Sequence, residues 1–224
     1  MENSIAGNKI KKQKIVLINQ SSGYLFIDVV NAFCKEYDEV VLFAGEVVVM
    51  NIPLNPKVKV VQIAKYNKKS IVSRSLSWLF GFIKSVVLLN LYYRDYEVLA
   101  SSNPPLLNML PLFCKNKTSL LVYDVYPDGL AAAGFIKQNG LLFNLWCRLN
   151  KKAFKRLQSI TTITNGMASA LAAYIDSSKI SVVPLWSNQD LDNLQVIPAE
   201  NEFVKKFGLQ NKFLIIYLIR IKNT

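Results

Sequence analysis

Short, almost wholly apolar runs alternate with longer segments of helical periodicity along most of the chain. Short β-branched runs are typical of strands buried on both faces, and their alternation with helices is typical of a parallel sheet. We therefore predict an α/β fold with a Rossmann-like parallel sheet flanked by helices. The predicted strands are 14–19, 39–44, 58–63, 97–100, 119–123, 159–164 and 179–184, and the predicted helices are 24–37, 70–93, 106–113, 141–158 and 167–174.

The segment 70–93 predicts a long helix in which polar or small residues recur every three or four positions and the other positions are apolar. Two arrangements fit this pattern: a helix largely buried against the sheet, or a helix partly immersed in a bilayer interface, with Lys84 and Arg94 reaching lipid phosphates. A membrane-spanning helix is disfavoured, because a lysine at the bilayer centre costs about 2.5–3.5 kcal/mol. The polar positions are Ser70, Ser73, Arg74, Ser77, Gly81 and Lys84.

The chain carries 27 Lys and Arg against 15 Asp and Glu, a formal net charge of +12, which indicates an anionic partner. Acids are absent from 47–94 and from 129–175, so these two segments supply much of the basic surface. Both are also rich in Trp, Phe, Leu and Tyr, which favours an anionic membrane surface over the alternative of a plain solvated face. The sequence shows no RNA-binding signature, and we expect no nucleic-acid partner.

The chain contains no His, which excludes Ser-His and Cys-His nucleophilic pairs. Its three cysteines, Cys34, Cys114 and Cys147, form no CxxC pair, so we predict buried free thiols and neither a disulfide framework nor a zinc site. The first 14 residues are polar and basic, and the apolar run 15–18 is too short for a signal peptide. We therefore expect a cytoplasmic protein.

Two acids, Asp124 and Asp128, bracket Tyr126-Pro127 directly after the predicted strand 119–123. Ligands of open α/β sheets gather beyond the carboxyl ends of strands, so both acids are candidates for holding or ionising a substrate hydroxyl. The alternative for each acid is a helix N-cap. The Tyr126 ring can pack either on a sugar or on neighbouring side chains.

Beyond the last predicted strand, 185–199 is polar and is interpreted as a linker. The segment 201–207 predicts a helix that ends at Gly208, and 213–219 predicts a new strand. A strand of that kind opens a further unit, yet the sequence ends five residues later. We expect a domain over 1–186, a linker over 187–200 and the truncated start of a second Rossmann-like domain over 201–224.

Four different short motifs lie at long spacings along the chain, each at the carboxyl end of a predicted strand. They are Ile18-Asn19-Gln20 with Ser22-Gly23, Ser102-Asn103-Pro104-Pro105, Tyr123-Asp124-Val125-Tyr126-Pro127-Asp128, and Val182-Val183-Pro184-Leu185-Trp186-Ser187. Their order, over about the first 218 residues, resembles the amino-terminal half of family 4 glycosyltransferases, retaining enzymes of the GT-B type that build bacterial surface polysaccharides.

The chain departs from that family in three places. One glycine, Gly23, stands where two adjacent glycines are usual, and Leu185 stands where Asn is usual in the hinge between the domains. The family's Ser-Gly-Asn type of loop does not follow Tyr217. From this last departure we infer a truncated or frameshifted product.

The resemblance implies that Gly23 lies where backbone N–H groups approach a phosphate at a helix N-terminus; an ordinary helix-entry turn is the alternative. It implies no metal, because helix dipoles and basic side chains of the second domain would stabilise the leaving diphosphate. It implies no cofactor, because the nucleotide-sugar is a co-substrate that the second domain chiefly binds. Trp186 is expected to pack at the hinge, and no catalytic residue is assigned. The substrate-binding residues implied are Ser22, Gly23, Asn103, Asp124, Tyr126 and Asp128.

The implied function is a hexosyltransferase-type transfer from a nucleotide-sugar donor to a lipid-linked or saccharide acceptor in bacterial surface polysaccharide biosynthesis. A polyprenyl diphosphate-sugar acceptor and an anionic membrane surface would place the protein peripherally at the inner face of the plasma membrane. The alternatives are a catalytically inactive fragment and a membrane-surface binding module. The truncated chain by itself is expected to be inactive.

Overall fold

The computed structural model describes residues 13–50, 52–184, 201–210 and 212. The chain divides into two compact units, Met1–Leu185 and Trp186–Thr224. In the second unit, helix α7 (Glu202–Lys206) follows Asn201, whose side chain accepts hydrogen bonds from the backbone N–H groups of Phe203 and Val204. Gly208 ends this helix with a φ of 59°, as predicted. The predicted linker, Trp186 and the predicted strand 213–219 lie outside the described residues.

The first unit is built on a seven-stranded sheet in which every pair of neighbouring strands is parallel. The strand order is β5-β3-β1-β6-β7-β8-β9, so the chain winds outward from β1 in one direction and then returns to continue from β6 in the other. This is the doubly wound arrangement, with its switch point between β1 and β6. The strands are β1 (Lys14–Ile18), β3 (Glu39–Ala44), β5 (Lys59–Gln62), β6 (Glu97–Ser101), β7 (Thr118–Val122), β8 (Ile160–Thr162) and β9 (Ile180–Val182).

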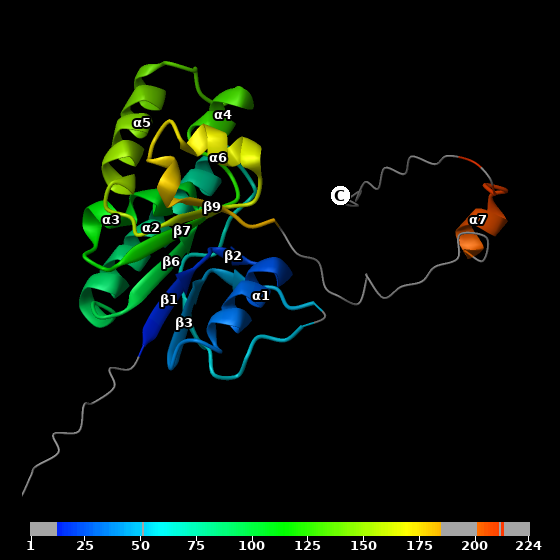
Figure 1. Cartoon of the computed structure of the whole chain (residues 1–224), viewed down its shortest axis with the longest axis horizontal. Helices are drawn as coiled ribbons and strands as arrows, with labels where there is room; N and C mark the ends of the chain where they lie inside the picture. The colour runs from blue at the N-terminus through cyan, green and yellow to red at the C-terminus, as the bar shows by residue number, and fades with distance from the viewer. Residues whose placement is uncertain (1–12, 51, 185–200, 211, 213–224) are drawn as a thin grey trace, which may run out of the picture. The chain divides into compact units, whose positions relative to one another are not determined.

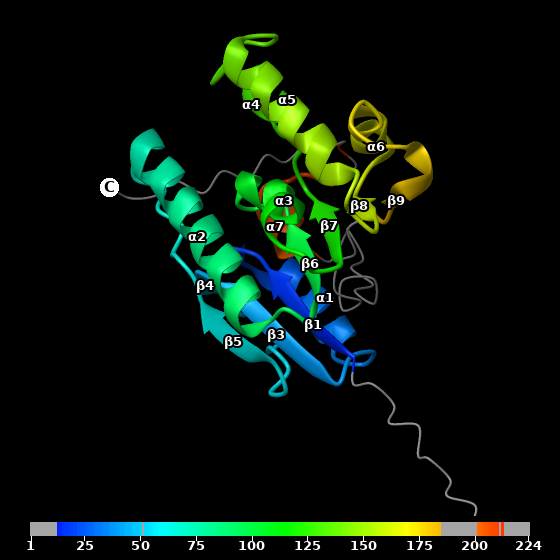
Figure 2. The same ribbon diagram turned by 90° about the vertical axis from the view of Figure 1, so that its left-hand side faces the viewer.

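Both faces of the sheet are covered, which explains the continuous apolar runs in the sequence. In β1 the side chains of Ile15 and Leu17 enter one buried cluster and those of Val16 and Ile18 enter the other. Helix α1 (Tyr24–Phe33) packs on the first of these clusters, on the right of the sheet in Figure 1. The other face carries α2 (Ile71–Tyr92), η1 (Pro105–Met109), α3 (Leu110–Phe113), α5 (Leu141–Phe154) and α6 (Asn165–Leu171), several of which are nearest the viewer in Figure 2.

Four short elements were not predicted from the sequence, and one of them is the 3₁₀ turn η2 (Ser177–Lys179) before β9. The strands β2 (Ser21–Ser22) and β4 (Glu46–Val47) form a separate two-stranded sheet, and α4 (Asp128–Ala132) follows β7. Two-residue strands have no periodicity of their own, because they exist only through their partner. The segment 106–113 also differs from the expected helix, since its first half is the 3₁₀ turn η1 and only its second half is the α-helix α3.

All three cysteines are free. Cys34 and Cys114 are buried, as predicted, whereas Cys147 is only half-buried and lies 3.3 Å from the Tyr174 hydroxyl. Burial raises the pKa of the Cys114 thiol to about 11, so this thiol stays protonated near neutral pH.

Helix α2 places a stripe of small residues inward and most of its apolar positions outward, and Lys84 of the predicted polar stripe is exposed. Ser77, Gly81 and Ser85 face the domain together with Phe82 and Leu89. The carbonyl oxygen of Ser77 accepts a 2.7 Å hydrogen bond from the amide of Gln20, which is fully buried just beyond β1. A Cβ on Gly81 would lie only 3.0 Å from that amide nitrogen, so the glycine permits the close approach.

Of the two arrangements that the sequence left open for this helix, the one largely buried against the sheet does not hold, because the apolar side of α2 faces away from the domain. Only 17% of the most apolar 18-residue stretch of α2 is buried. Among the described residues, α2 is the one helix whose length and composition would suffice to cross a membrane. Because the inner side of α2 is packed against the domain, its length and composition alone do not indicate a membrane-spanning helix.

Candidate functional site

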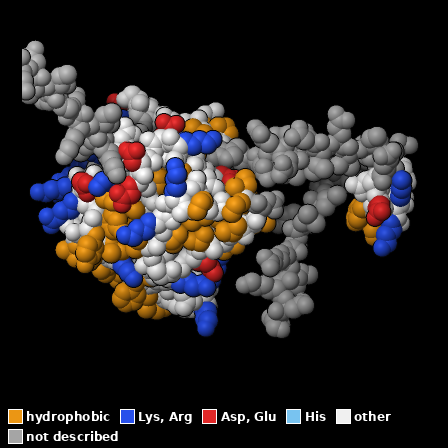
Figure 3. All heavy atoms as spheres, turned by 90° about the horizontal axis from the view of Figure 1, so that it is seen from below, with side chains coloured by type: hydrophobic (Ala, Val, Ile, Leu, Met, Phe, Trp, Pro, Cys, Tyr) orange, Lys and Arg blue, Asp and Glu red, His pale blue; other side chains and the backbone are white. Residues whose placement is uncertain are grey.

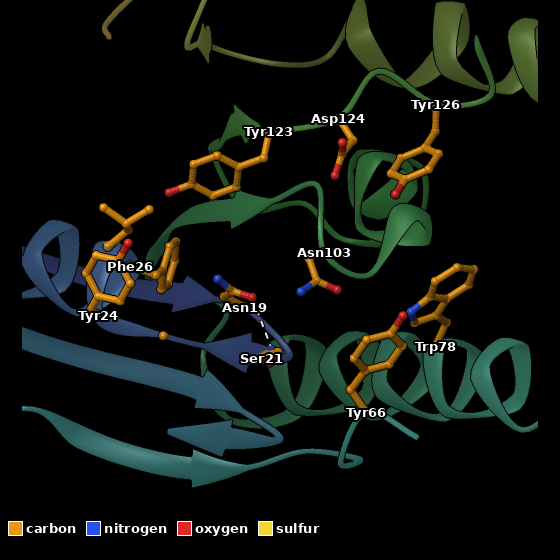
Figure 4. Close-up of a pocket in the computed structure, with 12 residues that line it drawn as sticks. Asn19, Ser21, Tyr24, Phe26, Tyr66, Trp78, Asn103, Tyr123, Asp124 and Tyr126 are labelled. Carbon is orange, nitrogen blue, oxygen red and sulfur yellow. Dashed lines mark hydrogen bonds between the residues drawn. The ribbon is translucent and has the colours of Figure 1, made fainter. Parts of the chain in front are cut away.

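A cavity of about 370 Å³ opens at the carboxyl ends of β1, β6 and β7, beside the switch point of the sheet. This is the position at which open α/β sheets bind ligands. Figure 4 shows side chains from several loops and from α2 pointing into it. The lining residues are Asn19, Ser21, Gly23, Tyr24, Leu25, Phe26, Tyr66, Trp78, Asn103, Tyr123, Asp124 and Tyr126.

Gly23 lines the cavity and is the N-cap residue of α1. Its backbone is extended, with φ −89° and ψ −177°, and no side chain caps the helix. A Cβ at this position would meet nothing within 4 Å, so the space in front of the first turn is open. Uncapped backbone N–H groups together with the positive end of the helix dipole suit an anion at this point.

Ser22 does not line the cavity, in contrast to its predicted role in binding substrate. Its side chain is fully buried, and its hydroxyl donates to the carbonyl oxygen of Asn19 at 3.0 Å. The pairing of β2 with β4 turns this residue inward. Ser22 therefore shapes the loop that precedes α1.

Two asparagines face each other across the switch point. Asn19 is 4% exposed, and its side-chain oxygen accepts from the backbone N–H of Ser21 at 3.2 Å. The carbonyl oxygen of Asn103 accepts from the backbone N–H of Gln20 at 3.0 Å, which ties the loops after β1 and β6 together. The Asn103 side chain points into the cavity in Figure 4, as its predicted role requires.

Asp124 and Tyr126 project into the cavity from the loop after β7. The Ser102 hydroxyl oxygen accepts from the backbone N–H groups of Tyr123 at 3.0 Å and Asp124 at 3.1 Å, which orients this loop. Asp124 is solvent-exposed and therefore accessible to a ligand. The Tyr126 ring stacks on Trp146 with centroids 6.4 Å apart, so one of its faces packs on a side chain.

Asp128 does not line the cavity, so the structure does not bring it together with the other predicted substrate-binding residues. It begins α4, and its carboxylate accepts a 2.5 Å hydrogen bond from the Tyr174 hydroxyl. The N-cap position belongs to Pro127, so Asp128 does not cap the helix either. A carboxylate in the first turn still interacts favourably with the positive end of the helix dipole. We therefore assign Asp128 a structural role.

The cavity wall opposite Asp124 comes from residues that the sequence did not single out. Tyr66, in the loop after β5, stacks on Trp78 of α2 with ring centroids 6.1 Å apart and planes 12° apart. The only signal was that 47–94 is rich in aromatic residues and lacks acids, which says nothing about where their rings point. Aromatic faces of this kind pack well on the apolar faces of sugar rings.

Two buried donors beside this wall have no partner among the described residues. They are the Nε of Arg74 and the Nε1 of Trp78, both on α2. Buried polar groups are almost always hydrogen-bonded, so an unpaired donor at a cavity wall suits a ligand oxygen. The Arg74 guanidinium lies close enough to Tyr126 to oppose the rise in the pKa of that phenol.

Burial raises the pKa of Tyr126 to about 12, and the Asp124 carboxylate and Tyr66 add to the rise. Burial likewise raises the pKa of Tyr123 to about 12, and burial with a hydrogen bond to Glu97 does so for Tyr37. At neutral pH these phenols are hydrogen-bond donors rather than bases. None of them therefore serves as a proton acceptor in a reaction at this cavity.

The raised pKa values of these phenols predict that the folded chain loses stability at alkaline pH. From the ordinary pKa of 10 up to about 12, the folded chain retains phenolic protons that the unfolded chain has released, so the free energy of unfolding falls as pH rises. The contribution of these phenols to the free energy of unfolding is fully present below pH 10 and is lost as pH rises toward 12. Absorbance titration should show some tyrosines forming phenolate only near pH 12 while circular dichroism still reports a folded chain. Ionisation of every tyrosine together near pH 10 in a folded chain would contradict this.

The sheet order and the cavity define a Rossmann-like domain with a cavity at its switch point. A solved structure of WaaG, a glycosyltransferase involved in lipopolysaccharide biosynthesis, matches 88% of this chain and 52% of its own, with 13% identity and a TM-score of 0.52. This likeness confirms the predicted fold class. Phytolacca americana UGT2, complexed with UDP-2fluoro-glucose and pterostilbene, matches 82% of this chain and 57% of its own, with 9% identity and a TM-score of 0.47.

In sequence, the chain is similar to the probable glycosyltransferase WbjE of Pseudomonas aeruginosa. The two are 29% identical over 142 residues, which cover 61% of this chain and 34% of WbjE. The chain thus spans about a third of that curated relative and about half of WaaG. No protein-family model matches the chain.

Proposed function

We propose that this chain supplies the acceptor-binding domain of a glycosyltransferase that moves a hexose from a nucleotide-sugar to a lipid-linked or saccharide acceptor in bacterial surface polysaccharide biosynthesis. The likenesses to WbjE and to the fold of WaaG support the reaction class. The observation that carries the proposal is the cavity at the switch point, with a carboxylate on one wall and stacked aromatic rings on the other.

The chemistry of the cavity suits a saccharide. Tyr66 and Trp78 offer an aromatic surface for a sugar ring, and the Asp124 carboxylate can accept hydrogen bonds from sugar hydroxyls. The side-chain amide of Asn103 can both donate and accept at the same end of the sheet. These residues bind and orient an acceptor, and Asp124 is the one carboxylate among them that can take a proton from an attacking hydroxyl.

The cavity also offers donors for an anion. The open first turn of α1 at Gly23 and the unpaired Nε1 donor of Trp78 suit phosphate oxygens. A polyprenyl diphosphate-sugar carries both a sugar and such an anion, which is why we favour a lipid-linked acceptor. A protein that uses this acceptor would work peripherally at the cytoplasmic face of the plasma membrane, and the net charge of +12 supports attachment there.

A second candidate is a membrane-surface binding module without catalysis, which the outward apolar side of α2 favours. The two candidates differ in whether the cavity binds sugar. A module of this kind would bind vesicles but leave the cavity empty of saccharide.

The test is saccharide binding and transfer by the 224-residue chain. Purified chain is titrated with short saccharides and with a soluble prenyl diphosphate-sugar, and binding is followed by tryptophan fluorescence, since Trp78 lies in the cavity wall. Transfer is assayed in parallel with radiolabelled nucleotide-hexoses. Saturable binding that Tyr66→Ala abolishes, with the Trp78 reporter left in place, supports the acceptor site. Absence of binding by every saccharide and diphosphate-sugar would refute it.

A further inference from the structure

The outer face of α2 is an apolar surface that the described part of the chain leaves uncovered. Its side chains recur at spacings of three and four residues, so they form one stripe along the helix. Several are more than half exposed, among them Val72 at 69%, Phe80 at 59% and Leu91 at 61%. The outer face consists of Ile71, Val72, Leu76, Leu79, Phe80, Ile83, Val87 and Leu91.

We propose that the outer face of α2 docks on an anionic bilayer, with the helix lying parallel to the membrane and its apolar side chains inserted at the level of the lipid headgroups. In Figure 3 hydrophobic side chains gather into an extended patch on one side of the described domain, with Lys and Arg side chains at its border. A continuous row of exposed apolar side chains, such as the outer face of α2, marks an interaction surface.

Charge decides which partner fits the outer face. No Asp or Glu occurs in 47–94, while Lys68 and Lys69 precede the helix, Lys84 lies on it and Arg94 follows it. Cations at both ends and in the middle of an apolar stripe can reach lipid phosphates while the helix lies flat. A second copy seated on this face would bring the same cations against each other, which disfavours a dimer.

A shallow groove beside the helix extends the outer face toward the edge strand β5. Its volume is about 460 Å³, and its lining is apolar apart from Lys84. Such a groove provides a seat for a lipid chain, with the lysine ammonium placed to reach the headgroup phosphate. The main lining residues are Ile63, Phe80, Ile83, Lys84, Val87 and Leu88.

The inner side of the helix restricts it to the membrane surface. Ser77, Gly81 and Ser85 are buried against the domain, and the Gln20 amide is bonded to Ser77. A helix attached along one side cannot be surrounded by lipid, so it cannot span the bilayer without leaving its domain. A helix with one side fixed and one side apolar suits the interface.

Docking would also place the cavity beside the bilayer, because Trp78 of the same helix forms part of the cavity wall. A lipid-linked acceptor could then present its sugar to the cavity while its chain stays in the membrane. This last step rests on the proposed function, whereas the docking itself does not.

The experiment is vesicle co-sedimentation of the 224-residue chain. Vesicles of phosphatidylcholine mixed with phosphatidylglycerol should bind the chain, vesicles of phosphatidylcholine alone should bind it less, and added salt should weaken the binding. The double variant Ile83→Glu/Val87→Glu should bind anionic vesicles about tenfold more weakly or worse. Both positions are about half exposed, so circular dichroism should report an unchanged fold.

The matched control is Val49→Glu/Met50→Glu, which places the same charges on equally exposed apolar residues in the loop after β4. This control should bind vesicles like the unmodified chain. Equal losses in both variants would show a mere effect of charge and overturn the proposal. The proposal is also overturned if the unmodified chain does not bind vesicles and instead forms a dimer, detected by light scattering, that the Ile83→Glu/Val87→Glu variant abolishes. Vesicle binding without saccharide binding would leave the docking intact and refute the proposed function instead.

Discussion

Replacing Gly45 by alanine is expected to lower the free energy of unfolding by about 3 kcal/mol or more. A Cβ at this position would lie 2.2 Å from the carbonyl oxygen of Ala64 and 2.9 Å from that of Gln20. Both obstacles are backbone atoms, so a rotamer change cannot relieve the contact. The N–H of Gly45 also donates to Gln20 at 2.9 Å, which fixes the glycine in this close approach.

Urea unfolding followed by circular dichroism measures this effect. The control is Gly129→Ala, because a Cβ at Gly129 meets nothing within 4 Å. The control should change stability by less than about 1 kcal/mol. Matching unfolding curves for the two variants would mean that the loops after β1, β3 and β5 do not meet at Gly45 as the structure has them.

Replacing Asp124 by asparagine is expected to weaken saccharide binding, and any transfer, about 10- to 100-fold. The carboxylate is exposed at the cavity wall, and a hydrogen bond from a sugar hydroxyl to a charged acceptor is stronger than one to an amide. The fold should persist, since the contacts that orient this loop run from backbone N–H groups to Ser102. The measurement is the dissociation constant for the best saccharide found in the fluorescence titration.

Asp128→Asn is the matched control, an identical change four residues away at a carboxylate that does not line the cavity. Its hydrogen bond with Tyr174 would weaken, so the free energy of unfolding should fall while saccharide affinity stays unchanged. An Asp124 variant that binds saccharide like the unmodified chain would reduce Asp124 to a surface acid. A loss of affinity in the Asp128 variant alone would reverse the two assignments.

Most of the sheet could be predicted from the sequence because a parallel strand covered on both faces is apolar at nearly every position. The same reasoning located the loops at the carboxyl ends of the strands and singled out Asp124, while the family resemblance added Gly23, Asn103 and Tyr126, and all four line the cavity. Residues that directly follow a strand keep that position whatever the order of strands in the sheet. Their meeting in one cavity depends on β1, β6 and β7 being neighbours.

Ser22 and Asp128 show where reasoning from sequence position failed. Both are polar and follow a strand closely, yet Ser22 is turned inward by the pairing of β2 with β4, and Asp128 is held by a tyrosine 46 residues further along the chain. Tyr66 and Trp78 show the converse, since neither follows a recognisable motif and both reach the cavity wall. Contacts between distant segments leave no periodic pattern in the sequence.

The sequence by itself determined the strands of the main sheet, the longer helices and the stripe of small residues in 70–93, because each of these follows from the spacing of apolar positions along a short segment. Only the tertiary structure decided which side of α2 faces the domain. A stripe of Ser77, Gly81 and Ser85 lets the helix approach the buried Gln20 closely, and the bulky side chains are thereby left outside. Spacing reveals that a helix has two sides, but it is close packing against a neighbour that selects the inner one.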